Sequence, residues 1–143
     1  MERMFHMLLY RAFHAQRNRL RPVLAGLGLG PGQPKLLGYL ERQGPCRQKE
    51  LADYFEVDPA AVSRMLEALE RGGFILRRPE TPGGRRDLME ITEAGRGAYT
   101  AWRGCCREME EEMLQGFEAE ERERFADYLS RAYQNLRGGE GRS

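Results

Sequence analysis

The stretch DPAAVSRMLEALERGG, residues 58–73, constrains the fold more than any other part of this sequence. Its large apolar residues recur at i, i+3, i+4 and i+7, on one face of a helix, and they are Val62, Met65, Leu66 and Leu69. Asp58 is a good N-cap, Pro59 suits the first helical position, and a glycine pair follows Arg71. The sequence therefore predicts an amphipathic helix from Pro59 to Arg71.

The opposite face of this helix is small, polar and positively charged in its first half. It holds Ala60, Arg64, Glu67 and Arg71, with Ala61 and Ser63 on its flanks. An isolated helix with such a face is usually a solvated surface helix, so the neighbouring segments decide what the face is for.

Those neighbours complete a larger motif. RQKELADYF, residues 47–55, predicts a second short helix, and only three residues separate it from Pro59, as in a helix-turn-helix. Phe74–Arg78 and Asp87–Ile91 predict two strands, and the loop PETPGGRR between them ends in two arginines. A helix-turn-helix followed by a basic-tipped hairpin is a winged helix.

Further helices with apolar faces flank this motif. One is predicted over residues 2–20, ending before Pro22, and another over 33–42. Thr92 is expected to cap a long helix, and a last helix covers about 119–136. The first helix and the last two are peripheral, and their apolar faces are too many for one small winged helix to cover. We therefore expect a second chain to bury them.

Length and composition fit one globular domain. The chain has 143 residues, of which 41% are hydrophobic and 31% charged. No apolar run approaches the roughly 18–20 residues of a membrane span, and no signal peptide opens the chain, so we expect a cytoplasmic protein. Its three cysteines form neither a disulfide framework nor a metal-binding spacing, and we expect no metal or cofactor.

Charge placement favours DNA more than net charge does. The net charge is +1, and residues 44–92 carry eight basic and nine acidic side chains. However, four arginines cluster in the predicted wing, namely Arg77, Arg78, Arg85 and Arg86. Because the Debye length is about 8 Å at physiological salt, local clusters matter more than the sum. Arginine also suits bidentate contacts to phosphate and guanine.

The helix-turn-helix, the wing and the Thr-Glu-x-Gly at 92–95 resemble the multiple-antibiotic-resistance regulator (MarR) family, and the flanking helices extend the likeness over nearly the whole chain. The resemblance implies a mainly α winged helix (α+β) with a two-stranded wing. It also implies a homodimeric transcription factor, usually a repressor, that binds double-stranded DNA. It implies one domain over 1–143, with a DNA-binding lobe at 33–92 and dimerisation helices at 1–24 and 93–137.

Within that resemblance, Arg85 matches the wing arginine that enters the minor groove. The residues predicted to contact DNA are Gln48, Lys49, Ala60, Ala61, Ser63, Arg64, Arg77, Arg85 and Arg86. The family often has an acidic residue two positions before the wing arginine, where it helps to hold the wing. Gly83 stands there in this chain, so we expect Arg85 to be mobile until DNA binds.

The resemblance also implies two ways of releasing DNA: a small aromatic or anionic effector, or oxidation of a cysteine. The residues expected to line an effector pocket are Tyr10, His14, Tyr39 and Trp102. Cys105 lies on the apolar face of its helix and a disulfide between adjacent helical cysteines is strained, which leaves Cys106 as the redox candidate. With no histidine near Cys106 to activate its thiol, we favour the effector.

Catalysis is not expected. His6 and His14 lack the i, i+4 spacing with which two imidazoles share a metal, and Ser63 has no base relay. A winged-helix scaffold that contacts proteins and not DNA is the remaining alternative, because a fold alone does not fix function. The low net charge favours that scaffold, whereas the placement of the arginines opposes it.

Overall fold

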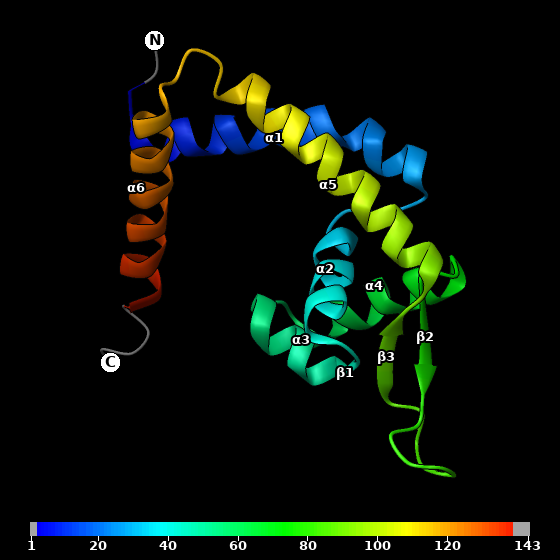
Figure 1. The fold of residues 1–143 in the computed structure, drawn as a ribbon. Coiled ribbons are helices and arrows are strands. Elements are labelled where there is room, and N and C mark those ends of the chain that lie inside the picture. Colours follow the sequence, from blue (N-terminus) through cyan, green and yellow to red (C-terminus); the bar gives the residue numbers. More distant parts are fainter. Residues whose placement is uncertain (1–2, 139–143) are drawn as a thin grey trace. The chain divides into compact units, whose positions relative to one another are not determined.

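The computed structural model of this chain describes residues 3–138, which form helices and a small antiparallel sheet (Figure 1). The helices are α1 (Phe5–Leu27), α2 (Gln33–Gln43), α3 (Gln48–Phe55), α4 (Pro59–Arg71), α5 (Glu93–Met113) and α6 (Ala119–Gly138). The strands are β1 (Cys46–Arg47), β2 (Ile75–Arg78) and β3 (Leu88–Ile91). The predicted fold class, a mainly α winged helix, is confirmed.

The chain divides after Met109 into two compact units, and the first contains the winged helix. Helices α2, α3 and α4 pack with the sheet around one apolar core. Its most deeply buried side chains are Leu36, Leu37, Leu40, Leu51, Val62, Leu66, Leu69 and Met89. Each such side chain contributes about 1.5–3 kcal/mol by leaving water. The predicted core face of α4 is confirmed.

Helix α4 begins and ends at the predicted residues. One carboxylate oxygen of Asp58 accepts hydrogen bonds from the backbone N–H groups of Ala60 and Ala61, at 3.1 and 3.3 Å. These bonds satisfy donors that the first turn leaves without helical partners. At the other end Gly73 adopts φ 81°, a left-handed conformation that suits glycine and turns the chain into the sheet.

The sheet has a third strand, β1, that no sequence pattern predicts. Strand β3 lies between β1 and β2, and Cys46 of β1 pairs with Met89 of β3. Two residues are too few to produce a hydrophobic period, so β1 gave no signal. Because Arg47 is extended and belongs to β1, the helix predicted from residue 47 begins at Gln48. The β2–β3 hairpin is the predicted two-stranded wing.

The prediction that the first helix ends before Pro22 is wrong. Helix α1 continues to Leu27 with Pro22 inside it, although proline cannot donate to the carbonyl of Asn18. The continuation is stabilised because Leu24 and Leu27 pack against the core of the winged helix. Tertiary packing therefore outweighs the local cost of the proline.

A close contact joins α5 to the turn after α4. The Thr92 hydroxyl donates to the carbonyl oxygen of Gly73 at 2.7 Å and accepts from the N–H of Gly95 at 3.1 Å, so the predicted Thr92 cap is confirmed. A Cβ on Gly95 would lie 2.2 Å from the backbone oxygen of Phe74, so only glycine allows this approach.

The second unit contains α6, and none of its residues is buried. Its predicted range is confirmed, with an extension to Gly138. The Phe117 and Phe125 rings stack with their centroids 5.9 Å apart, and Arg122 pairs with Glu111 at 2.8 Å. In the part of the chain that the structure describes, no helix combines the length and apolarity needed to cross a bilayer.

We expect Gly95→Ala to lower the free energy of unfolding by about 1–3 kcal/mol, because the new methyl group overlaps the backbone of Phe74. Gly97→Ala in the same helix is the control, because its methyl group would meet no atom within 4 Å. The control should leave stability unchanged or raise it by up to about 1 kcal/mol. Urea unfolding of both variants measures the difference, and equal effects would contradict the close contact.

Candidate nucleic-acid interface

The outer face of α4 is presented to solvent because its other face is buried in the core. Ala60 and Arg64 are exposed, and Ala61 and Ser63 are partly exposed. The turn before α4 is tight: Glu56 is left-handed, with φ 55°, and the N–H of Val57 bonds to the carbonyl of Ala52 at 3.1 Å. The packing of α3 and α4 thus fixes which side chains α4 offers to a partner.

The wing loop, residues 79–87, contains a tight turn at its tip. The N–H of Gly84 donates to the carbonyl of Thr81 at 2.9 Å, with Pro82 and Gly83 between them, and Gly83 has φ 78°. Proline followed by a left-handed glycine is the pattern of a type II turn. Because this backbone conformation is left-handed, a side chain at position 83 would be strained.

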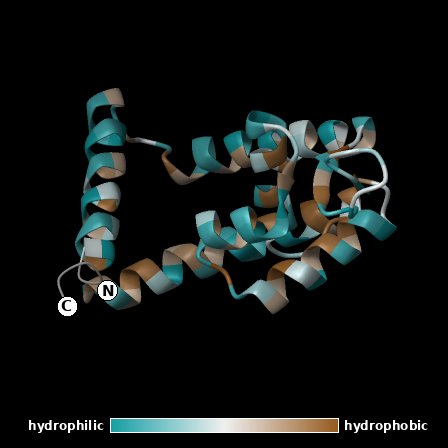
Figure 2. Cartoon of the chain, turned by 90° about the horizontal axis from the view of Figure 1, so that it is seen from below, coloured by the Kyte–Doolittle hydropathy of each residue, from teal (hydrophilic) through white to brown (hydrophobic). Residues whose placement is uncertain are grey.

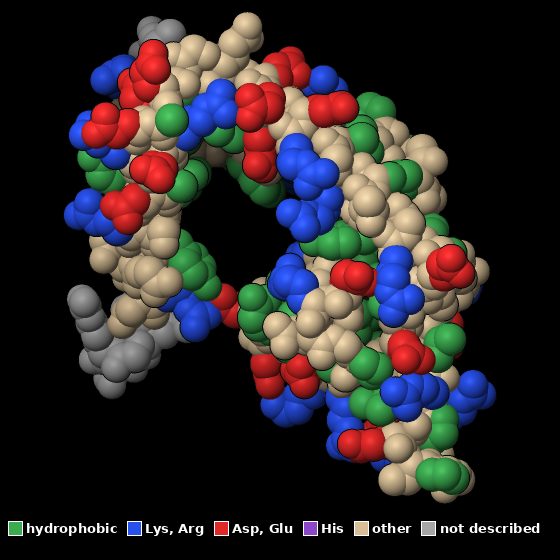
Figure 3. Space-filling model, viewed as in Figure 1, with side chains coloured by type: hydrophobic (Ala, Val, Ile, Leu, Met, Phe, Trp, Pro, Cys, Tyr) green, Lys and Arg blue, Asp and Glu red, His purple; other side chains and the backbone are tan. Residues whose placement is uncertain are grey.

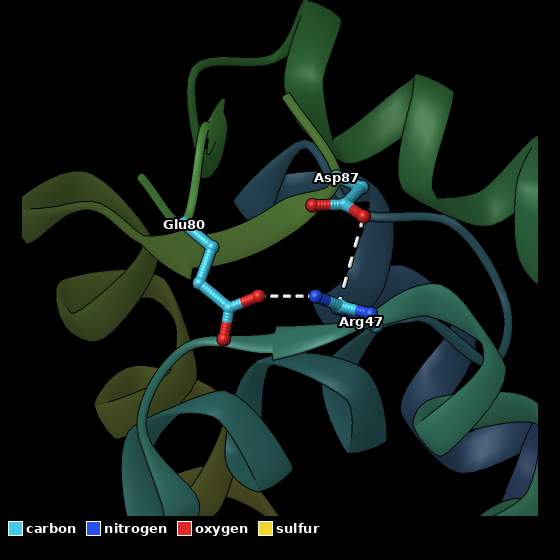
Figure 4. Close-up of polar contacts among 3 residues, drawn as sticks. All are labelled: Arg47, Glu80 and Asp87. Atoms are coloured by element: carbon cyan, nitrogen blue, oxygen red, sulfur yellow. Dashed lines mark hydrogen bonds and ion pairs between the residues drawn. The ribbon is translucent and has the colours of Figure 1, made fainter. Parts of the chain in front are cut away.

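An ion-pair network supports the wing loop at both ends (Figure 4). The Arg47 guanidinium donates to Glu80 near the start of the loop, and its Nε lies 3.7 Å from the Asp87 carboxylate at the end. Its pKa is raised, chiefly by the hydrogen bond to Glu80. No local sequence pattern predicts this role of Arg47, because Glu80 lies 33 positions away.

The arginines predicted to contact DNA differ in availability. Arg64 and Arg85 are exposed and have no acidic partner among residues 3–138. Arg86 is exposed and donates to the backbone carbonyl of Arg77 at 3.2 Å. Arg77 itself pairs with Glu70 of α4 at 3.1 Å, and its side chain is only 25% exposed. Arg77 therefore braces β2 against α4.

The other predicted contacts lie at the start of α3. Gln48 and Lys49 form its first turn, where backbone N–H groups and the helix dipole favour an anion. Lys49 pairs with Asp53 at 2.8 Å, and that bond raises the pKa of the lysine. Both partners are largely exposed, so the pair competes poorly with a phosphate.

A hollow of about 350 Å³ opens between the start of α3 and the wing. It is lined by Arg47, Gln48, Lys49, Arg77, Arg85, Arg86, Asp87 and Met89. Five cations and one carboxylate thus surround a space that is large enough to admit a backbone phosphate. On the visible face of the lobe, blue and red side chains are interspersed, so its positive charge is local (Figure 3).

A second hollow, of about 560 Å³, lies in the first unit among α1, α2 and α5. Its lining combines five cations with four aromatic rings and has no acidic residue: Arg17, Arg21, Lys35, Arg42, Arg103, Phe13, Phe55, Tyr99 and Trp102. Cys106 also lines it, next to Arg103 on α5. This lining suits an anion that carries an aromatic ring.

Of the residues predicted to line an effector pocket, Trp102 lies at this second hollow. Tyr10 and His14 do not line it; their rings stack on each other along α1, 5.8 Å between centroids. Tyr39 is buried, and its hydroxyl donates to Glu50, a bond that raises the pKa of Tyr39 to about 12. Burial raises the pKa of the Cys46 thiol to about 12, so it is inert at neutral pH.

Known proteins are similar to this chain over the helix-turn-helix and the wing loop. The MarR family model matches residues 29–86. The uncharacterized HTH-type transcriptional regulator YxaD of Bacillus subtilis (strain 168) is 36% identical over 96 residues, or 67% of each chain. The crystal structure of MarR is 26% identical, with a TM-score of 0.83 over 100% of this chain and 99% of that chain.

A complex of S. aureus MepR with DNA shares the fold at 23% identity, with a TM-score of 0.78 over 93% of this chain and 96% of that one. The proteins to which this chain is similar are regulators and not enzymes, as predicted. The sequence match to YxaD and the family model over the helix-turn-helix and wing lead to one assignment. The chain belongs to the MarR family of winged helix-turn-helix transcriptional regulators.

Proposed function

We propose that this chain is a homodimeric repressor that binds a pseudo-palindromic operator and leaves it when a small effector binds. The observation that carries the proposal is the placement of Arg64 and Arg85, whose guanidinium groups have no acidic partner among residues 3–138. They lie on the solvent face of α4 and on the wing loop. Membership of a regulator family and the DNA complex of MepR support the same function. A repressor acts at the chromosome, which for this chain we take to be in the cytoplasm.

On this proposal α4 enters the major groove with its N-terminal half first. That half offers Ser63 and Arg64 to base edges and phosphates. The carboxylates of Glu67 and Glu70 follow further along, where Arg77 neutralises Glu70. The hollow between the start of α3 and the wing receives a backbone phosphate, and Arg85 reaches the minor groove.

Exposed apolar faces on α1 and α6 support a dimer. In Figure 2 brown apolar residues alternate with teal ones along the helix that starts near the N label. On α1 the exposed apolar residues are Phe5, Leu8, Leu9, Tyr10 and Phe13; on α6 they are Phe125, Tyr128, Leu129, Tyr133 and Leu136. Phe5 is 90% exposed, and such surface rarely stays in water without a partner. We propose that a second copy covers both faces and that residues 1–24 and 93–137 form the dimerisation region.

Dimerisation predicts the symmetry of the DNA site. Selection of bound duplexes from a random library should return a pseudo-palindrome whose half-sites lie about 10 bp apart, or a small multiple of that spacing. A library that yields no symmetric site, from protein that is dimeric by light scattering, would oppose the proposal.

Substitutions of Arg64 and Arg85 should have different effects. We expect Arg64→Ala to cost about 1–3 kcal/mol of binding and to relax the sequence preference. Arg85→Ala should weaken binding and reduce the slope of log K against log salt by about one, with less change in preference. The control is Arg96→Ala, because Arg96 pairs with Glu41 outside the interface. If both variants bind like the control in anisotropy titrations, the protein-scaffold alternative gains.

The second hollow predicts the chemistry of the effector. Trp102 is the only tryptophan and lines the hollow, so its fluorescence reports on binding there. Benzoate should quench it and lower DNA affinity, whereas neutral benzamide should do neither. Arg103→Ala should weaken benzoate binding by about tenfold, because a charge-assisted hydrogen bond is lost.

Peroxide treatment distinguishes the effector from the redox alternative. If an effector is the switch, peroxide should leave DNA affinity unchanged in wild type and in Cys106→Ser. A large loss in wild type that Cys106→Ser escapes would favour oxidation of Cys106.

A further inference from the structure

We propose that Arg47 positions the wing for DNA binding by holding Glu80 and Asp87, the acids near the two ends of the wing loop. We call these three residues the wing clasp. The proposal rests on the proposed DNA-binding function and adds a residue that controls where Arg85 lies.

The backbone of Arg47 is fixed on both sides. It is the last residue of β1, where it pairs in register with Leu88 of β3, and it is also the N-cap residue of α3. Its side chain therefore starts from a point that the sheet and the helix both hold. Glu80 and Asp87 come from opposite ends of the loop and meet at this one guanidinium (Figure 4).

Other ties within the wing loop are local. The turn bond from Gly84 to Thr81 closes four residues at the tip, and Arg86 donates to the carbonyl of Arg77. Neither bond joins the loop to α3. Among the described residues, the ion pairs of Glu80 and Asp87 give this loop its link to the helix-turn-helix.

The clasp also determines the charge that Arg85 meets. Glu80 and Asp87 are the acidic residues of the loop, and both engage Arg47 while Arg85 has no acidic partner among residues 3–138. If the clasp opens, these carboxylates are released beside Arg85 and can pair with it. The clasp therefore keeps Arg85 available to phosphate and limits where the loop can carry it.

The expected effect is modest. The Arg47 and Glu80 side chains are each 56% exposed, and exposed ion pairs bias a conformation by only about two- to fivefold. Two carboxylates on one guanidinium form a small network, so we expect removal of both to weaken DNA binding by about three- to tenfold.

The direction in which operator affinity changes when Glu80 and Asp87 are neutralised tests the clasp. The double variant Glu80→Gln, Asp87→Asn removes two negative charges from the DNA-facing side of the lobe. If those acids only repel phosphate, operator affinity rises; if they position the wing, operator affinity falls. Glu41→Gln is the matched control, because it breaks the Arg96–Glu41 pair of similar exposure elsewhere in the same unit.

A double-mutant cycle then separates positioning from direct contact. We expect Arg85→Ala to lower affinity by about tenfold in wild type and by less than about threefold when both acids are replaced. Arg47→Lys keeps the charge but lacks the planar guanidinium that can donate to two carboxylates. Its operator affinity should therefore lie between those of wild type and Arg47→Ala. If Arg47 acts only by touching phosphate, Arg85→Ala will cost the same in both backgrounds.

Hydrogen exchange of the unbound protein tests the clasp without DNA. Amides of residues 79–87 should exchange faster in the acid double variant than in wild type, and Glu41→Gln should not change them. Wild type that fails to bind any duplex would defeat the proposed function, while the exchange result would still decide the clasp. The clasp alone would be overturned if wild type binds the operator, the acid double variant binds it equally or more tightly, and Arg85→Ala lowers affinity equally in both.

Discussion

The burial of one face of α4 is the constraint on which the rest of the interface depends. Val62, Leu66 and Leu69 are fully buried, so the helix cannot rotate about its axis without exposing them. Because a helix has two opposed faces, the same packing that excludes water from these residues directs Arg64 outward. The orientation of the recognition face is thus a consequence of hydrophobic burial.

Ion pairing then separates five arginines of the lobe into two groups. Arg47, Arg77 and Arg78 pair with carboxylates and hold the wing, the sheet and α4 together. Arg64 and Arg85 have no such partner among the described residues and remain available to an anion. A lobe with balanced charge can therefore present a local cationic surface, since nearby charges act within about one Debye length.

The sequence predicted the elements whose signal is local. The period of α4, its Asp58 cap and the Thr92 cap of α5 depend on residues within a few positions, and all three are confirmed. The continuation of α1 past Pro22 was not predictable, because it depends on packing against distant core residues. Strand β1 is too short to show a period, and the wing clasp joins residues 33 positions apart. The contacts with DNA and the effector remain predictions.

We propose that the outer face of α4 and the wing read a specific DNA sequence. Anisotropy titration should compare the selected operator with a scrambled duplex of equal length and composition, both at 0.15 M salt. We expect the operator to bind at least about 1,000-fold more tightly than the scrambled duplex. Equal affinity for the two duplexes would contradict it.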